Sequence, residues 1–199
     1  MKKLLLILLC LPMIGFGQDL SLTAKDYFDK AYNNKSDWQY QIDNYTQAIR
    51  IDPDYTHAYN NRGNVYKELE NYNDAIDDYS RAIRIDPELA YTYDGRGQVY
   101  YALKNYKNAL DDYSRAIRID PDYTNAYNNR GAVYEELGNH NDAIDDFSRA
   151  IRIDSEYLAA YYNRGLMKEK MRLPYCSDYK SACDLGNEQC CEWYYKQCR

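Results

Sequence analysis

The sequence contains few residues of the kinds that build catalytic and metal sites. It has only two histidines, His57 and His140, and no motif places a nucleophile beside either of them. No glycine-rich loop of the kind that cradles phosphate groups is present. No C-x-x-C pair occurs, which argues against a zinc site among the cysteines. We therefore expect no catalytic residue, no metal and no cofactor, and we interpret the chain as a protein that is not an enzyme.

An excess of positive charge is also absent. The 199 residues carry a formal net charge of -6, from 25 lysines and arginines against 31 aspartates and glutamates. Proteins that bind the phosphate backbone of nucleic acids usually have a basic face. This balance of charge therefore argues against a nucleic-acid partner.

Long apolar runs are missing except at the N-terminus. Lys2 and Lys3 precede an apolar run from Leu4 to Phe16, which is too short to span a bilayer comfortably. A basic start, a short apolar run and small residues at its end are typical of a secretory signal peptide. We predict that residues 1–17 are such a signal, cleaved before Gln18, and that the mature chain has no membrane span.

Export would take the protein to the periplasm or the extracellular medium. An acylated cysteine at Cys10 is the alternative, but lipoprotein signals require a small residue before the cysteine and Leu9 is bulky. The prediction is therefore a soluble exported protein rather than a lipoprotein.

The most informative feature present is a repeat of 34 residues. An Arg-Gly pair recurs on this period at Arg62-Gly63, Arg96-Gly97, Arg130-Gly131 and Arg164-Gly165. A fixed period of this length indicates stacked supersecondary units rather than one globular core. Such an array presents an extended surface and seldom an enclosed active site.

Each repeat has the pattern of a helical hairpin. Apolar and small residues at three- and four-residue steps predict one helix over about 56–69 and a second over about 72–85. Asp86-Pro87 ends the second helix, because the residue before proline avoids helical geometry. A glycine inside a helix costs up to about 1 kcal/mol relative to alanine. We therefore expect Gly63 to lie where the two helices pack closely.

The unit resembles the tetratricopeptide repeat, a family of 34-residue helical hairpins. Its small and aromatic signature positions match Tyr59, Gly63, Tyr66, Ala75, Tyr79, Ala82 and Pro87. The next two repeats match at the corresponding positions, except that Ser155 replaces the proline. The resemblance implies an all-α solenoid, wound as a right-handed superhelix, with about four to five repeats and a C-terminal capping helix.

The repeats at the two ends depart from the pattern. We assign a degenerate first repeat to 22–55, three regular repeats to 56–89, 90–123 and 124–157, a shortened fifth repeat to 158–185, and a cysteine-rich capping helix to 186–199. The first repeat has Asp29 in place of the glycine and Gln41 in place of the first alanine. Terminal repeats are expected to be atypical because one side of each faces water.

Five cysteines fall within the last 24 residues, at Cys176, Cys183, Cys190, Cys191 and Cys198. In an exported chain such a cluster usually forms disulfides. Partners in an antiparallel helical hairpin have a constant sum of residue numbers, which predicts the pairs Cys176–Cys198 and Cys183–Cys191. Cys190 is then unpaired, and the alternative exchanges Cys190 for Cys191. Zinc binding by these cysteines is disfavoured, and so is a redox-active thiol at Cys190-Cys191.

In the tetratricopeptide family the first helices of successive repeats line a concave groove that binds extended peptides or partner helices. By this resemblance the groove-lining candidates are Asn60, Asn64, Tyr91, Asp94, Gln98, Tyr101, Asn128 and Tyr162. Amide side chains can both donate to and accept from a peptide main chain, and tyrosines are frequent anchors at interfaces. The alternative is that the amides only solvate a helix face.

The hypothesis is therefore a scaffold that binds a protein or peptide in its groove. Only Lys67 is placed like the lysines that clamp a terminal carboxylate in some family members, so we disfavour that ligand. The alternative function is a structural subunit of a cell-envelope assembly with no peptide groove. The sequence indicates neither the partner nor the oligomeric state.

Four arginines, Arg62, Arg96, Arg130 and Arg164, also recur with the repeat. They could line a groove for anions, or each could pair with an aspartate of the second helix. Asp78, Asp112 and Asp146 recur in step with them, and mixed charge along helices usually indicates ion pairing. We therefore favour structural ion pairs.

Overall fold

A computed structural model of the chain describes residues 22–198, and the signal peptide predicted for residues 1–17, with Cys10, lies outside them. The described part contains eleven helices and no strand. The helices are α1 (Ala24–Asn33), α2 (Trp38–Ile51), α3 (Thr56–Glu68), α4 (Tyr72–Ile85), α5 (Ala90–Ala102), α6 (Tyr106–Ile119), α7 (Thr124–Glu136), α8 (His140–Ile153), α9 (Leu158–Lys170), α10 (Cys176–Asp184) and α11 (Glu188–Gln197).

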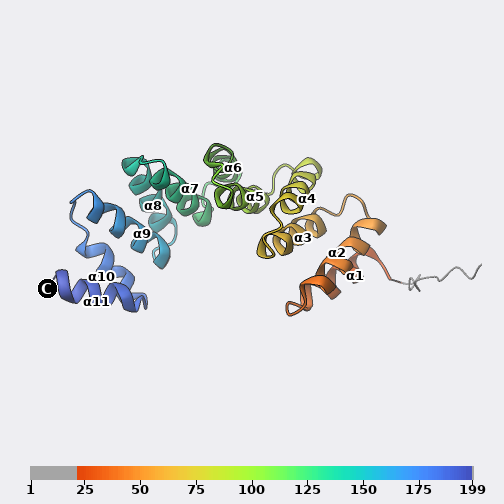
Figure 1. Cartoon of the computed structure of the whole chain (residues 1–199), viewed down its shortest axis with the longest axis horizontal. Helices are drawn as coiled ribbons and strands as arrows, with labels where there is room; N and C mark the ends of the chain where they lie inside the picture. Colours follow the sequence, from red (N-terminus) through yellow and green to blue (C-terminus); the bar gives the residue numbers. More distant parts are fainter. Residues whose placement is uncertain (1–21, 199) are drawn as a thin grey trace, which may run out of the picture.

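The helices form a row of antiparallel hairpins. Each helix packs on the next one along the chain, from α1 on α2 to α10 on α11, and the hairpins follow one another along an arched array (Figure 1). The helices predicted over 56–69 and 72–85 are α3 and α4. The prediction of an all-α solenoid of helical hairpins is therefore confirmed.

The first helices of successive hairpins also contact one another. α3 contacts α5, α5 contacts α7, and α7 contacts α9, whereas no comparable contact joins α1 to α3. Because these helices approach one another along the array, they form its inner layer. The N-terminal helix α1 departs from this layer.

The repeated glycines allow the two helices of a hairpin to approach. A Cβ atom added at Gly97 would lie 2.7 Å from Cε1 of the buried Tyr113 ring, and one added at Gly131 would lie 2.7 Å from Cε1 of Phe147. These distances are shorter than any ordinary van der Waals contact. Close packing on a buried ring therefore explains why the helices retain a residue of low helix propensity.

The periodic arginines form structural ion pairs, as predicted. Arg96 donates from Nε and Nη2 to the two carboxylate oxygens of Asp112, both at 2.8 Å, and from Nη1 to Ser80 at 2.9 Å. Arg62 pairs in the same way with Asp78, and Arg130 with Asp146. Each arginine thus joins the two helices of its hairpin to the second helix of the hairpin before. Arg164 completes the series with Asp178.

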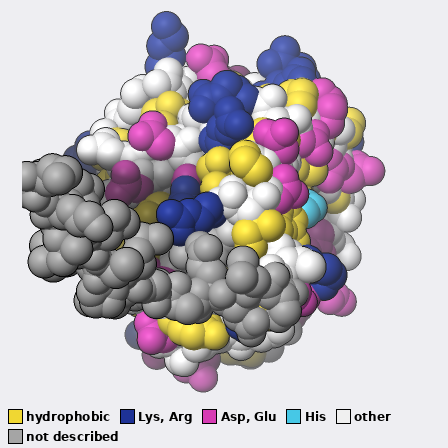
Figure 2. All heavy atoms as spheres, turned by 90° about the vertical axis from the view of Figure 1, so that its right-hand side faces the viewer, with side chains coloured by type: hydrophobic (Ala, Val, Ile, Leu, Met, Phe, Trp, Pro, Cys, Tyr) yellow, Lys and Arg dark blue, Asp and Glu magenta, His cyan; other side chains and the backbone are white. Residues whose placement is uncertain are grey.

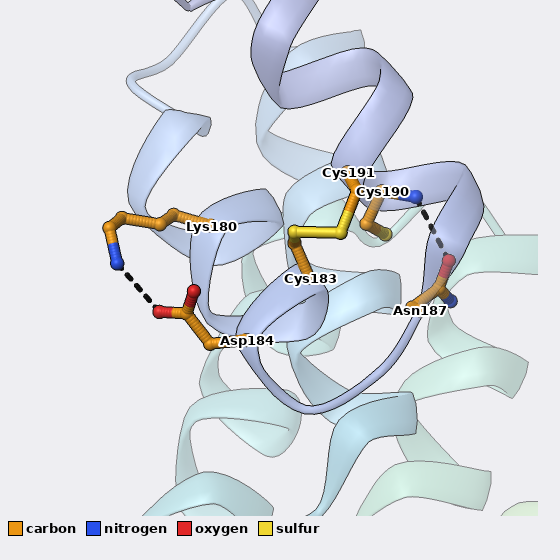
Figure 3. The surroundings of a disulfide bond; sticks show 6 residues. All are labelled: Lys180, Cys183, Asp184, Asn187, Cys190 and Cys191. Atoms are coloured by element: carbon orange, nitrogen blue, oxygen red, sulfur yellow. Dashed lines mark hydrogen bonds and ion pairs between the residues drawn. A yellow bond between two sulfur atoms is a disulfide. The ribbon is translucent and has the colours of Figure 1, made fainter.

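The C-terminal hairpin of α10 and α11 carries two disulfides. Cys176 is bonded to Cys198, with Cα atoms 5.7 Å apart, and Cys183 is bonded to Cys191, with Cα atoms 4.6 Å apart. This is the pairing that the spacing predicts, and Cys190 is left as a buried free thiol. Figure 3 shows the second disulfide beside the start of α11, where Asn187 accepts from the backbone N–H of Cys190 at 2.9 Å.

Candidate binding groove on the inner helices

Polar side chains join the inner helices to one another. Lys67 of α3 donates to Oε1 of Gln98 on α5 at 2.8 Å. Asn129 of α7 donates to Asp94 of α5 at 2.9 Å, and Asn163 of α9 donates to Asn128 of α7 at 3.0 Å. These contacts form a ladder of hydrogen bonds across the inner layer. Amides of α7 and α9 reach back to the preceding inner helix, whereas α5 is joined to α3 by Lys67.

Three of the groove candidates are buried in the inner layer rather than exposed at its surface. Asn60, Asp94 and Asn128 are 5%, 3% and 8% exposed. They occupy corresponding positions of successive repeats. Asp94 and Asn128 each accept a hydrogen bond from the next inner helix and so hold neighbouring repeats together, whereas Asn60 donates to Asn61 on its own helix.

Asp94 is the only acidic residue among these three. Its Oδ2 atom accepts from Gln98 at 2.7 Å and from the Tyr123 hydroxyl at 3.5 Å, and its Oδ1 atom accepts from Asn129. Burial raises the pKa of this carboxyl, while the bonds from Asn129 and Gln98 and the charge of Lys67 oppose the rise. The carboxylate is thus held by neutral donors, and Lys67 reaches it only through Gln98.

A cavity of about 430 Å³ opens beside Asp94, between α5 and α7. It is lined by Gln98, Tyr101, Tyr113, Asn125, Asn129, Ala132 and Tyr157. Two groove candidates, Gln98 and Tyr101, therefore share one hollow. Burial raises the pKa of Tyr101, and the nearby carboxylates of Glu136 and Glu135 raise it further. The Tyr101 side of the cavity therefore carries negative charge.

Asn129 and Tyr157 are among the side chains of this cavity that sequence reasoning missed. Asn129 is next to the candidate Asn128 in the sequence, and its contact with α5 depends on how the hairpins are rotated. Tyr157 precedes α9, and its hydroxyl donates to Oδ1 of Asn125 at 2.8 Å. The signal was available, because tyrosine also stands at 55 and 123, on the 34-residue period.

The remaining candidates lie elsewhere on the inner layer. Asn64 accepts from the Tyr79 hydroxyl at 2.6 Å. The hydroxyl of Tyr91 lies 2.8 Å from Nδ1 of His57, which again joins α5 to α3. Tyr162 lines a separate pocket of about 80 Å³ against the C-terminal cap, with Trp193 and the free thiol of Cys190. The eight candidates are therefore spread over the array, and only some of them share a cavity.

Neither a cluster of metal-ligand side chains nor a membrane-spanning helix is found among the described residues. Residues 22–198 contain no group of three or more His, Cys, Asp or Glu side chains that could hold a metal ion. In the same part of the chain, none of the helices has the length and apolarity needed to cross a bilayer. Burial raises the pKa of the Cys190 thiol, and a raised pKa lowers the fraction of reactive thiolate.

Two family models match the chain. A model described as TPR repeat matches residues 30–70 and 97–138, and a model described as tetratricopeptide repeat matches residues 57–89 and 124–157. Together they cover more than half of the chain. None of the curated proteins is significantly similar to it in sequence.

Solved structures are similar to the whole array. A crystal structure of the protein MamA is 26% identical, with a TM-score of 0.71, over 81% of this chain and 91% of that one. YrrB, described as a TPR protein with an unusual peptide-binding site, is 24% identical, with a TM-score of 0.67, over 87% of this chain and 92% of that one, and it supports the fold alone. The first TPR domain of Spaghetti (RPAP3), bound to an HSP90 peptide, is 25% identical, with a TM-score of 0.57, over 59% of this chain and 93% of that one.

Proposed function

Because the chain belongs to the tetratricopeptide repeat family, we propose that it is a protein-interaction scaffold without catalytic activity. We place the binding site in the cavity between α5 and α7, where an extended peptide or a partner helix would lie. The observation that supports this proposal most directly is the hollow of about 430 Å³ that polar amides and tyrosines line together.

The amides of this cavity are positioned by their bonds to Asp94. Asn129 uses an N–H on the carboxylate and also lines the cavity, so its carbonyl oxygen is the group that would accept from a peptide N–H. Gln98 is held from both ends, by Lys67 and Asp94. A side chain held by neighbours loses less conformational entropy when a ligand binds, which favours affinity. Tyr101 and Tyr157 then supply contact area, as aromatic anchors commonly do.

The charge around the cavity favours a neutral or basic ligand. Asp94 bonds to two of its lining side chains, Gln98 and Asn129, and Glu135 and Glu136 lie near Tyr101. A ligand with an acidic residue here would meet negative charge, which is unfavourable at an interface. This agrees with the view that the chain does not clamp a terminal carboxylate.

We also propose that the protein is exported, to the periplasm or beyond the cell. The two disulfides of the α10–α11 hairpin support this location, since disulfides persist in oxidising compartments and are rare in the cytosol of most organisms.

The groove proposal can be tested with a partner captured from the cell-envelope fraction and then purified. Calorimetry should show that Tyr101→Ala and Asn129→Ala each weaken its binding by about tenfold or more, as expected for the loss of a central interface side chain. Tyr40→Ala is the matched control, because Tyr40 is exposed on α2, away from this cavity. Unchanged affinity for both groove variants would instead favour binding through the edges or outer face, as in a structural subunit.

A further inference from the structure

A second cavity, of about 200 Å³, lies at the N-terminal end of the array, between α1, α2 and α3. Its aromatic walls are Tyr32, Trp38 and Tyr45, and Gln41 also lines it. Tyr32 and Trp38 are 51% and 43% exposed. Neither the cavity between α5 and α7 nor the function proposed for it involves these side chains.

The cavity exists because the first hairpin departs from the repeat. In the next three hairpins the position of Gln41 holds a fully buried alanine, and the tyrosine corresponding to Tyr32 packs on the core. Here α1 does not contact α3 as α3 contacts α5. The side of α3 that an inner helix would otherwise cover therefore lines a cavity, with the largely buried Val65 in its wall.

Gln41 carries a hydrogen-bonding group that the protein itself does not satisfy. The residue is 6% exposed, and its Nε2 atom is buried without a partner. A buried donor without an acceptor costs free energy that a correctly placed acceptor recovers. Since Gln41 lines the cavity, a small shift of its side chain would bring Nε2 within reach of an acceptor on a ligand there.

The charges at this cavity indicate which ligand fits. Lys35 and Glu68, of opposite charge, both line it, so the site has no net charge to attract an ion. Figure 2 looks onto this end of the array, where apolar side chains lie among both acidic and basic ones. The lining thus combines an aromatic surface, one unsatisfied amide donor and two side chains of opposite charge.

We propose that this N-terminal pocket binds a bulky, uncharged side chain of a peptide partner, whose adjacent backbone carbonyl accepts a hydrogen bond from Nε2 of Gln41. The aromatic walls hold the side chain by apolar burial. The amide selects the backbone, because a ligand without a carbonyl at that position leaves the donor unsatisfied. The site would add a second, separate point of attachment to the array.

The minimal probe is N-acetyl-phenylalaninamide, which carries an aromatic side chain between two amide carbonyls. Titration of the ¹⁵N-labelled, oxidised protein should give saturable shifts of the Gln41 side-chain amide and the Trp38 indole signals. Gln41→Ala should weaken the probe about tenfold, as for one lost hydrogen bond of about 1.4 kcal/mol. This variant should still fold, because alanine is the residue of the next three repeats.

Three controls separate this site from its alternatives. Tyr40→Ala, beside the pocket on α2, and Tyr101→Ala, in the other cavity, should both bind the probe like the unchanged protein. N-acetyl-glutamic acid amide should bind much more weakly. The proposal is overturned if no saturable shift occurs, if the acidic probe binds equally well, or if Gln41→Ala leaves affinity unchanged. It is also overturned if sedimentation detects dimers that Trp38→Ala dissociates, because a second copy of the chain would then occupy the pocket.

Discussion

Replacing Asp94 with asparagine should stabilise the fold at neutral pH. The carboxylate is almost fully buried, and its direct partners, Asn129, Gln98 and Tyr123, are all neutral. One repeat later, Asn128 accepts the same kind of bond from the following inner helix. An asparagine at position 94 can therefore keep the bond from Asn129 while it removes a buried charge.

The size of the effect follows from two opposing contributions. Each unit by which burial raises the carboxyl pKa corresponds to about 1.4 kcal/mol of cost to the charged form. Against this, Gln98 must rotate its amide to accept from the amide group that the substitution introduces. It then loses its bond from the Lys67 ammonium, and a bond to a charged group is worth about 1.5–3 kcal/mol. We therefore expect a net gain of at most about 1 kcal/mol, or about 2–4 °C in Tm for a chain of this size.

The pH dependence has a definite sign. Burial raises the pKa of Asp94 above its ordinary value of 3.8, so the folded protein holds this proton more tightly than the unfolded chain does. The carboxyl therefore stabilises the fold below the unfolded pKa, and this contribution is lost as pH rises through the folded pKa. The advantage of Asp94→Asn should be largest near pH 7 and should shrink as the pH approaches 4.

Thermal unfolding followed by circular dichroism between pH 4 and pH 8 measures this difference. Asp111→Asn is the control, since Asp111 is exposed on α6 and its substitution should change little. A lower Tm of Asp94→Asn than of the unchanged protein at pH 7, or an equal gain at every pH, would contradict a costly buried charge at position 94.

Other substitutions test the packing of the array by the same measurement. Asp112→Ala leaves the half-buried Arg96 without its carboxylate partner and should cost about 3 kcal/mol, the lower end for a broken buried pair. Asp111→Ala should stay within about 0.5 kcal/mol, and equal effects would contradict a structural ion pair. Gly97→Ala drives a methyl group into the Tyr113 ring and should cost about 1–3 kcal/mol, so a neutral result would rule out the tight contact. Cys198→Ser opens a disulfide that joins residues 22 apart and should cost about 3 kcal/mol in the oxidised protein but nothing under reducing conditions.

The elements that followed directly from the sequence are those that repeat. The hairpins, the glycine contacts and the arginine–aspartate pairs each depend on residues a fixed number of positions apart, within one hairpin or between adjacent ones. The arginine and the aspartate of each pair, such as Arg96 and Asp112, are 16 residues apart in every regular repeat. Period and helix geometry then determine the contact. The pairing of Cys176 with Cys198 followed in the same way, from positions in one antiparallel hairpin.

The groove was less accessible to sequence reasoning because it depends on how one hairpin is rotated against the next. A helical wheel shows that Asn128 and Asn129 face the inner side, but not how deeply each is buried. The packing of α7 on α5 decides that Asn128 lies in the interface and that Asn129 also lines the cavity. The N-terminal pocket has a similar cause. Gln41 marks the first repeat as atypical, yet the opening depends on where α1 lies.

The ladder of amides also indicates where the array has most to gain from a ligand. Asn129 and Asn163 each reach back to the preceding inner helix, but the corresponding position in α5 is Gly95. A Cβ atom there would lie 2.9 Å from Cε1 of Tyr79. The glycine leaves room for that ring, but α5 then has no amide at this position to donate to α3. Asn60 consequently keeps a buried Oδ1 atom without a donor.

Among the side-chain amides of residues 22–198, the buried atoms without a partner are this Oδ1 atom of Asn60 and the Nε2 atom of Gln41. Both belong to the first two hairpins, whereas the amides that join α7 to α9 are paired. An unsatisfied buried group gains more from a new hydrogen bond than a group that must first break one. The N-terminal half of the array should therefore contribute more binding free energy per contact than the C-terminal half, where a ligand competes with bonds that the protein already makes.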